Sequence, residues 1–147
     1  MKKFCIEHIG IMVNHPVEMG AWYRDVLGFD IQFSADNGAD GVAFVRDNNK
    51  VMVEFGKVPN VEALKDRMNH HLQLHIALTS DDPDADADYL IEKGAKLIEK
   101  CAFTRPGDYL LALEDPWGHC IQLARRSPDS PLACTARLDD KVSPPPE

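Results

Sequence analysis

The sequence has few cysteines and no closely spaced pair of them. Its 147 residues include only four, and none belongs to a Cys-x-x-Cys motif. This spacing argues against a zinc knuckle or a redox-active dithiol, so reduced thiols are expected. The chain also lacks an apolar run long enough for a signal peptide or a membrane span. We therefore expect a cytoplasmic protein that has no membrane partner.

Clusters of basic residues are missing as well. The formal net charge is -8 at pH 7, with 16 lysines and arginines against 24 aspartates and glutamates. Because phosphate binding needs clustered Lys and Arg, no nucleic-acid partner is expected. A small anionic substrate stays compatible with this charge, since one local arginine is enough to bind it. The length suits a single domain with a real hydrophobic core.

What the sequence does contain is an internal duplication. Residues 7–11 (EHIGI) resemble residues 74–78 (LHIAL), so that His8 and His75 stand 67 positions apart. The similarity continues beyond these histidines with an offset that drifts by one residue in loops. An offset of 68 aligns Asp47 with Asp115 and Glu54 with Gln122. Two copies are too few for a solenoid, so the halves should close on each other into one domain.

The first half is predicted to form a β-α-β-β-β module. Alternating apolar residues predict a strand over residues 4–13, in which His8 and Gly10 share one face. A helix is predicted from Pro16 until Gly28 ends it. Three short strands are then predicted at 29–35, 41–46 and 50–56.

The second half repeats this order. A strand is predicted over residues 72–79, followed by a helix from Asp82 to Lys93 that Gly94 ends. Three strands are predicted near 96–102, 109–114 and 119–125. The predicted fold class is α+β, with two βαβββ modules whose curled mixed sheets enclose a cavity.

The domain boundaries follow from this pattern. We expect one domain over residues 1–126, with module one at 4–56 and module two at 72–125. The linker at 57–71 contains spaced apolar residues that would suit a short helix. Residues 127–147 hold five prolines and little apolar periodicity, which predicts a C-terminal arm or a frayed tail.

Four polar residues occupy matching positions in the two halves. If the two sheets curl toward one another, His8, Glu54, His75 and Gln122 converge from equivalent strands. Two imidazoles, a carboxylate and an amide oxygen make a first shell for one divalent ion such as Zn²⁺, Ni²⁺, Fe²⁺, Mn²⁺ or Co²⁺. Each residue also has a simpler interpretation. A lone inward histidine is more often a hydrogen-bonded core residue, and Gln122 is either a ligand or a degenerate position beside the metal.

Two further residues are candidates for substrate contact. His119 would line the mouth of the pocket, although an exposed turn histidine is the more common case. Arg105 precedes Pro106-Gly107, where a loop could cover the cavity, and it would act as an anion clamp.

Two segments carry a resemblance to a known family. Residues 22–29 (WYRDVLGF), which follow HIGI, and residues 115–123 (DPWGHCIQL) look like the vicinal oxygen chelate superfamily. That group contains lactoylglutathione lyase, methylmalonyl-CoA epimerase, extradiol dioxygenases, fosfomycin-resistance transferases and bleomycin-binding proteins. The resemblance covers roughly residues 4–125, and within the superfamily the chain most resembles lactoylglutathione lyase-like members. It implies a glyoxalase-like fold more strongly than any one reaction, because the scaffold serves several chemistries.

The resemblance also implies roles for the four matching residues. His8, Glu54, His75 and Gln122 occupy the positions from which the superfamily draws its metal ligands. Most metal-dependent members carry glutamate where this chain has Gln122. An amide oxygen still coordinates a metal but is no general base, so Glu54 becomes the expected catalytic residue.

Three functions are compatible with this reading. The leading one is a metal-dependent lyase or isomerase of the glyoxalase type, which acts on a small carbonyl or thioester substrate through an enediolate. The second is an extradiol-type Fe(II) dioxygenase, since two histidines and one carboxylate form its facial triad. The third is a metal-free small-molecule binding or resistance protein. In each case the exposed edges of the modules predict a homodimer.

Overall fold

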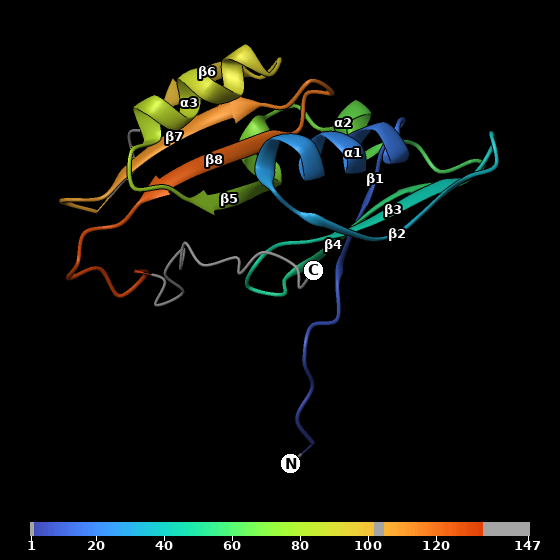
Figure 1. The fold of residues 1–147 in the computed structure, drawn as a ribbon, viewed down its shortest axis with the longest axis horizontal. Helices are drawn as coiled ribbons and strands as arrows, with labels where there is room; N and C mark the ends of the chain where they lie inside the picture. Colours follow the sequence, from blue (N-terminus) through green and yellow to red (C-terminus); the bar gives the residue numbers. More distant parts are fainter. Residues whose placement is uncertain (1, 102–104, 134–147) are drawn as a thin grey trace, which may run out of the picture.

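The chain forms two modules of the same topology, which lie side by side (Figure 1). The structure is a computed structural model that describes residues 2–101 and 105–133. The first consists of β1 (Ile9–Met12), α1 (Pro16–Leu27), β2 (Asp30–Asp36), β3 (Gly41–Arg46) and β4 (Met52–Lys57). The second consists of β5 (His75–Thr79), α3 (Pro83–Glu92), β6 (Lys96–Lys100), β7 (Tyr109–Glu114) and β8 (Cys120–Arg125). Between them lie α2 (Leu64–Arg67) and the 3₁₀ turn η1 (His71–Gln73). The predicted α+β class and the order of its elements are confirmed.

Each module contains one mixed four-stranded sheet. The strand orders are β1-β4-β3-β2 and β5-β8-β7-β6, so the two sheets do not close into a barrel. In both sheets the first strand runs parallel to the last one, and the remaining pairs are antiparallel. The copies even share an irregularity, since the register shifts between Ile31 and Phe33 in β2 and between Leu97 and Glu99 in β6. The edge strands of the two sheets include β1 and β5.

The duplication extends to the turn before the last strand of each module. Asp47 Oδ1 accepts a hydrogen bond from the amide of Val51 at 2.8 Å, and Asp115 Oδ1 accepts one from the amide of His119 at 2.9 Å. The turn places Lys50 at φ 67° and its counterpart Gly118 at φ 82°. Glycine adopts this left-handed conformation without steric cost, whereas lysine does not. The first copy therefore keeps the same turn at a conformational cost.

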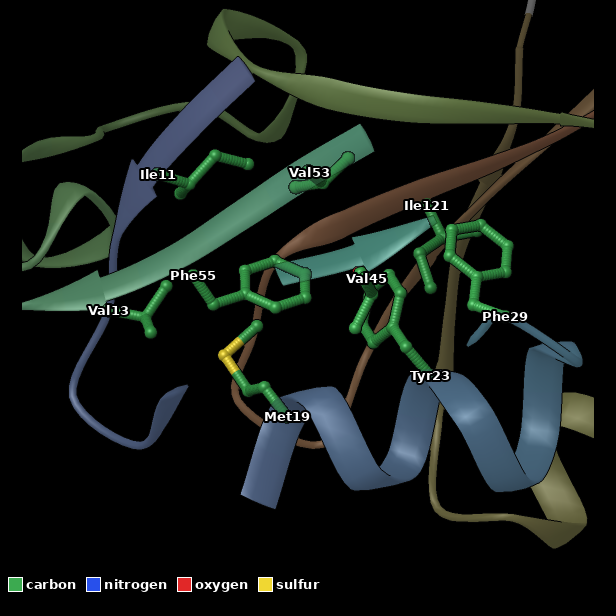
Figure 2. Packing of buried hydrophobic residues seen from close by; sticks show 9 residues of the cluster. All are labelled: Ile11, Val13, Met19, Tyr23, Phe29, Val45, Val53, Phe55 and Ile121. Carbon is green, nitrogen blue, oxygen red and sulfur yellow. The ribbon is translucent and has the colours of Figure 1, made fainter. Parts of the chain in front are cut away.

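Helix α1 covers one face of the first sheet and reaches the second module as well. A Cβ atom at Gly20 would lie 2.6 Å from the Cβ of Ala43, so glycine permits the close approach of α1 to β3. The main buried cluster also includes Ile121 of β8, a residue of the second module. Figure 2 shows this cluster, which consists of Ile11, Val13, Met19, Tyr23, Phe29, Val45, Val53, Phe55 and Ile121.

Polar contacts from α1 reinforce this junction between the modules. Trp22 donates its indole N–H to the carbonyl of Lys93 at 2.9 Å. In the opposite direction, the Tyr89 hydroxyl of α3 donates to the carbonyl of Val26 at 3.1 Å. Of the two neighbouring aromatic residues on α1, Tyr23 is fully buried, whereas Trp22 is half-buried at the junction.

The N-terminal strand is shorter than predicted. β1 begins at Ile9, which pairs with Val53, and β4 itself begins only one residue earlier at Met52, so residues 2–7 have no partner in β4. Residues 2–7, here called the N-terminal arm, are exposed and run away from the sheets (Figure 1). In the second module β5 likewise begins at His75 rather than 72, since η1 occupies the preceding residues.

The beginning of the predicted C-terminal arm is docked on the second module. The buried carboxylate of Asp108 accepts hydrogen bonds from the amide of Ser127 at 2.8 Å and from Arg126 Nη1 at 2.9 Å. Ser130 Oγ lies 3.4 Å from the same carboxylate. Hydrogen bonds thus hold the beginning of this segment to the second module, while residue 102 of the expected sixth strand and residues 134–147 of the expected tail lie outside the described residues. No helix in the described part of the chain is long and apolar enough to cross a membrane.

Candidate functional site

His8 and Glu54 form a close pair on the open face of the first sheet. His8 Nε2 lies 3.1 Å from Glu54 Oε2. Because β1 and β4 are parallel with Gly10 opposite Glu54, the two side chains emerge on the same face. This face is opposite to the one that packs against α1, where the alternate residues Ile11 and Phe55 are buried. Strand alternation thus brings His8 and Glu54 together, whereas their role as metal ligands stays a prediction.

Gly10 provides the space for this pair. A Cβ atom at position 10 would lie 3.1 Å from Glu54 Oε2 and 3.9 Å from His8 Nε2. A methyl group would therefore crowd the carboxylate at the point where it meets the imidazole. Sequence reasoning did not single out Gly10, although the second copy carries Ala77 at the same position.

The imidazole of His8 lies between two carboxylates. Its Nδ1 also contacts the carboxylate of Glu7. The hydrogen bond with Glu7 is the largest cause that raises the pKa of His8, and the charge of Glu54 adds to it. The edge of the ring packs against Phe44, with ring centroids 5.4 Å apart. Both ring nitrogens thus have acceptors, and a metal ion at Nε2 would have to displace a proton.

Glu54 is not an isolated buried charge. A carboxylate buried inside an apolar strand would be costly without a charged partner. The side chain of Glu54 is instead 25% exposed, and His8 is its partner. The case for a metal therefore rests on the set of donor groups and not on the burial of Glu54.

The second module carries the matching pair, His75 and Gln122, but these residues differ from His8 and Glu54 in their exposure and hydrogen bonds. In β5 and β8, Ala77 lies opposite Gln122, so His75 and Gln122 share a face just as His8 and Glu54 do. His75 is exposed, whereas Gln122 is buried and donates its amide N–H to Cys101 Sγ at 3.6 Å. The duplication thus extends to the face on which the polar pair lies, but within residues 2–101 and 105–133 no hydrogen bond or ion pair joins His75 to Gln122.

One chain keeps the two pairs apart. Within residues 2–101 and 105–133, no group of three or more His, Cys, Asp or Glu side chains is arranged to hold a metal ion. No hydrogen bond or ion pair described there joins His75 or Gln122 to His8 or Glu54. Within one chain, the His8–Glu54 pair and the His75–Gln122 pair therefore lie on two separate sheets, and their role as metal ligands stays a prediction.

The two candidate substrate residues lie elsewhere. His119 is half-buried at the junction of the modules, where it lines a void of about 10 Å³ together with His75 and Tyr23. Burial is the largest cause that lowers the pKa of His119. Arg105 is exposed in the loop before β7. Neither contacts the His8–Glu54 pair in the part of the chain that is described, and their roles stay predictions.

A larger cavity of about 270 Å³ lies beside the ends of β5 and β8. Its lining includes Ala77 and Thr79 from the open face of the second sheet and Leu132 from the docked C-terminal segment. This cavity was not predicted, because residues 127–133 were expected to form an arm or a frayed tail. It lies on the same face of the second sheet as His75 and Gln122.

The family model described as Glyoxalase/Bleomycin resistance protein/Dioxygenase superfamily matches residues 5–123. A comparison with curated protein sequences gave no match. Among solved structures, the glyoxalase family protein of Bacillus cereus is 16% identical with a TM-score of 0.64, over 84% of this chain and 95% of that chain. The predicted superfamily and its fold are thereby confirmed, whereas the likeness to lactoylglutathione lyase stays a prediction.

Two other similar structures come from proteins of different kinds. TnmS3, an antibiotic-binding protein from a Streptomyces species, is 20% identical with a TM-score of 0.61, over 86% of this chain and 99% of that chain. The fosfomycin resistance protein FosX from Listeria monocytogenes, in complex with Mn(II) and sulfate, is 12% identical with a TM-score of 0.61, over 86% of this chain and 95% of that chain. At these identities the similarity shows the fold alone.

Proposed function

Since this chain belongs to the glyoxalase, bleomycin resistance protein and dioxygenase superfamily, we propose that it is a metal-dependent lyase or isomerase that acts on a small carbonyl or thioester substrate. The observation that carries the proposal is the contact between His8 Nε2 and Glu54 Oε2 at 3.1 Å on an open sheet face. An imidazole and a carboxylate so placed suit two ligands of one divalent ion.

The rest of the ligand set is supplied by a second copy of the chain. His75 and Gln122 share a face in the second module, but one chain does not bring them to His8 and Glu54. In a twofold symmetric dimer, the first module of each copy would face the second module of the other. Two equivalent sites then form, each with His8 and Glu54 from one copy and His75 and Gln122 from its partner. This homodimer also agrees with the free edges of β1 and β5.

The chemistry then divides between the metal and the residues of the chain. A divalent ion, when bound, would polarise the substrate carbonyl and lower the cost of the negative charge that develops on loss of an α-proton. Glu54 removes this proton and returns it to the neighbouring carbon, while the hydroxyl proton of the enediolate moves to the former carbonyl oxygen. Together these transfers complete the isomerisation. Gln122 cannot share this task, because an amide takes up no proton at neutral pH. Glu7 orients the imidazole of His8 through Nδ1.

Metal content and turnover together test this proposal. The protein is purified without a nickel column, and the bound metals are measured in the native chain and in His75→Ala. We expect about one divalent ion per chain, lost on the substitution, and activity toward hemithioacetals. The matched control is His15→Ala, since His15 is an exposed histidine at the start of α1. Equal metal content in native chain and His75→Ala contradicts the proposed site, and oxygen uptake with a catechol would point to the dioxygenase instead.

A second candidate function is a metal-free protein that sequesters a small molecule. It is supported by Gln122, which is buried and bonded to Cys101 rather than turned toward His75. The antibiotic-binding protein TnmS3 shares the fold. A protein of this class would contain no metal after purification and would not bind Zn²⁺ or Mn²⁺ on titration, but it would retain a hydrophobic ligand.

A further inference from the structure

The cavity of about 270 Å³ at the ends of β5 and β8 has a wall that the two modules do not provide. Leu132 and Ala133 line it from the docked C-terminal segment, together with Ala77 of β5 and Ala124 of β8. The family model ends at residue 123, so Ala124, Leu132 and Ala133 all lie beyond the matched region. The cavity is therefore built in part by residues outside that region.

Hydrogen bonds hold this wall in place. The carboxylate of Asp108, whose side chain is 0% exposed, accepts from the amide of Ser127 at 2.8 Å. Ser130 then braces the end of the segment. Its Oγ accepts from the amide of Leu132 at 3.3 Å, and its carbonyl accepts from the amide of Ala133 at 3.0 Å. The cavity thus has a defined shape before any ligand enters, as is usual for small-molecule sites.

Two charged side chains give the cavity its polarity. Arg126 lines it, and its Nη1 donates to Asp108 Oδ2 at 2.9 Å. A guanidinium carries five N–H donors, and this bond uses one of them. Asp81 also lines the cavity, is exposed, and makes no hydrogen bond or ion pair recorded within residues 2–101 and 105–133. The cavity thus offers N–H donors from Arg126 and acceptor oxygens from Asp81.

The balance of these charges favours an uncharged ligand. The buried carboxylate of Asp108 neutralises Arg126, which leaves the negative charge of Asp81. Arg125 also borders the cavity, but its guanidinium lies 5.4 Å from the ring centroid of Tyr109, a residue outside the lining. A carboxylate in the cavity would face Asp81, and an ammonium would face the guanidinium of Arg126. A neutral group that both accepts and donates hydrogen bonds avoids the cost of an unpaired charge.

The backbone of β5 adds further hydrogen-bonding groups. The amide of Ser80 donates to the carbonyl of Ala124 at 3.1 Å. By the alternation of a parallel ladder, the N–H and C=O groups of Ala77 and Thr79 therefore point away from β8. Both residues are exposed and line the cavity. A ligand beside β5 can bond to peptide groups that the pairing with β8 does not use.

We propose that this cavity binds a neutral amide group that carries a compact apolar body. The amide carbonyl accepts from Arg126 and the amide N–H donates to Asp81, while the apolar body packs against Leu132 and Ala124. A cavity of about 150 Å³ takes up a benzene molecule, so about 270 Å³ has room for an aromatic ring with a short amide arm. Acids and amines of the same shape bind less well, because each meets a like charge.

The cavity also lies near the proposed metal site. Ala77, which lines it, is opposite Gln122 in the register of β5 and β8. Thr79 follows His75 by four residues on the same face, and four residues of strand span about 13 Å. A substrate whose carbonyl lies at His75 therefore places an amide-bearing tail in the cavity. That link to the substrate rests on the proposed function, whereas the binding of the amide itself does not.

Three ligands of matched shape test the chemical class. They are 2-phenylacetamide, phenylacetate and 2-phenylethylamine, which are neutral, anionic and cationic at pH 7. Each is titrated into the full chain with a chelator present, and binding is followed by the NMR shifts of the Ala77, Thr79 and Ala133 amides. We expect a dissociation constant at least fivefold lower for the amide than for the acid and the amine. No shift with the amide, or equal constants for the three ligands, overturns the proposal.

Arg126→Lys tests the donor side chain. Lysine keeps the positive charge beside Asp108 but lacks the planar fork of donors. We expect the dissociation constant of 2-phenylacetamide to rise at least fivefold. Arg125→Lys is the matched control, since it makes the same change at a neighbouring residue whose guanidinium lies over Tyr109. An equal rise in both variants, or none in Arg126→Lys, contradicts the role of Arg126.

Leu132→Trp tests the wall without a change to any charge. The larger ring fills the cavity, so 2-phenylacetamide should no longer shift the amides of Ala77 and Thr79. Leu97→Trp is the matched control, because Leu97 is 50% exposed against 58% for Leu132 and lies outside the lining. Binding that is unchanged in Leu132→Trp rejects this cavity as the site.

These measurements separate the cavity from the proposed metal site. Amide binding by a protein that holds no metal supports the cavity and leaves the metal site to fail alone. Metal binding by a protein that ignores 2-phenylacetamide removes the cavity and leaves the metal site. If both sites hold, 2-phenylacetamide should inhibit turnover of a hemithioacetal competitively in the native chain and not in Leu132→Trp. Equal inhibition of the two proteins contradicts the link between cavity and substrate.

Discussion

Tyr23 and Asp115 join the two halves of the chain through one buried hydrogen bond, with Oη 3.4 Å from Oδ2. The other carboxylate oxygen of Asp115 accepts from the amides of Trp117 and His119, both at 2.9 Å. Asp115 therefore fixes the turn before β8 and holds helix α1 of the other module at the same time. Burial is the largest cause that raises the pKa of each group. The strand that carries Gln122 is thus positioned from both modules.

Removing the Tyr23 hydroxyl should weaken this junction. Tyr23→Phe should lower the free energy of unfolding by about 1–2 kcal/mol, because a buried acceptor loses its donor. Chemical denaturation measures the change. Tyr89→Phe is the matched control, since its hydroxyl also bonds across the junction but its side chain is 42% exposed. If Tyr23→Phe and Tyr89→Phe lower the free energy of unfolding equally, the burial of the Tyr23–Asp115 hydrogen bond does not increase its contribution to stability.

Asp108 should make the free energy of unfolding depend on pH. The hydrogen bond from the Ser127 amide is the largest cause that lowers the pKa of Asp108, and Arg126 contributes to it. A carboxyl group whose pKa is lower in the folded state stabilises the fold at pH values above its unfolded pKa of about 3.9. This contribution is lost as pH falls below that value toward the folded pKa.

Asp108→Asn should therefore destabilise the chain at pH 6 and matter progressively less below pH 4. Urea unfolding at a series of pH values measures the difference between the native chain and the variant. Asp129→Asn is a suitable control, because Asp129 is exposed in the same segment and makes no hydrogen bond recorded among the described residues. A difference that stays constant down to pH 3 would contradict the role of the Asp108 charge.

The two copies of the aspartate turn allow a test of backbone strain. Lys50→Gly should stabilise the chain by up to about 1 kcal/mol, because glycine removes the steric cost of a positive φ. Gly118→Ala should destabilise it by a similar amount. Thermal unfolding measures both effects, and Lys50→Ala separates the loss of the side chain from the change in the backbone. Stabilisation by alanine as large as that by glycine would rule out strain as the cause.

Gly10 should control the proposed metal site without large effects on the fold. Gly10→Ala places a methyl group 3.1 Å from Glu54 Oε2 and should displace the carboxylate from His8. We expect metal affinity to fall about 10–100-fold, as it does when groups that orient a ligand are lost. Calorimetric titration with Mn²⁺ or Zn²⁺ measures it. Equal affinities in the native chain and in Gly10→Ala would contradict the prediction.

Glu54 and Gln122 should differ in how they affect turnover. Glu54→Gln retains a coordinating oxygen but loses the base, so the rate should fall on the order of 10²–10⁴-fold while some metal stays bound. Gln122→Glu should be tolerated or should raise metal affinity, because the added charge favours a divalent ion. Steady-state rates on a hemithioacetal, together with metal content, distinguish the two variants. Isomerase activity that survives Glu54→Gln would remove the assignment of Glu54 as the base.

The duplication explains why so much of the fold was predictable from one sequence. Each module repeats its strand order, its helix and its aspartate turn, so a pattern that is weak in one half is supported by the other. Strand alternation was likewise enough to place His8 and Glu54 on one face, because it depends only on local geometry. The separation of the His8–Glu54 pair from the His75–Gln122 pair within one chain was not predictable in this way. It depends on how α1 packs between the modules, which is set by contacts such as the one between Tyr23 and Asp115.

The ends of the chain were less predictable for a related reason. A strand needs a neighbour, and the alternation of residues 4–8 says nothing about where β4 begins. The docking of residues 127–133 depends on the carboxylate of Asp108, which is 19 residues from Ser127 in sequence. Composition alone classified this segment as an arm or tail, because prolines and a lack of apolar periodicity cannot indicate a buried partner elsewhere.

The matching register shifts in β2 and β6 bear on the ancestry of the chain. A shift of register reverses the faces of all the residues that follow it, so such a feature is costly to acquire late in a packed sheet. Its occurrence at equivalent positions is explained most simply if the irregular strand existed before the gene was duplicated. The half-length ancestor would then already have had this sheet and, with its apolar face uncovered, would have needed a second copy of itself. The fused chain inherited that mutual dependence as the packing of Ile121 into the core of the other half.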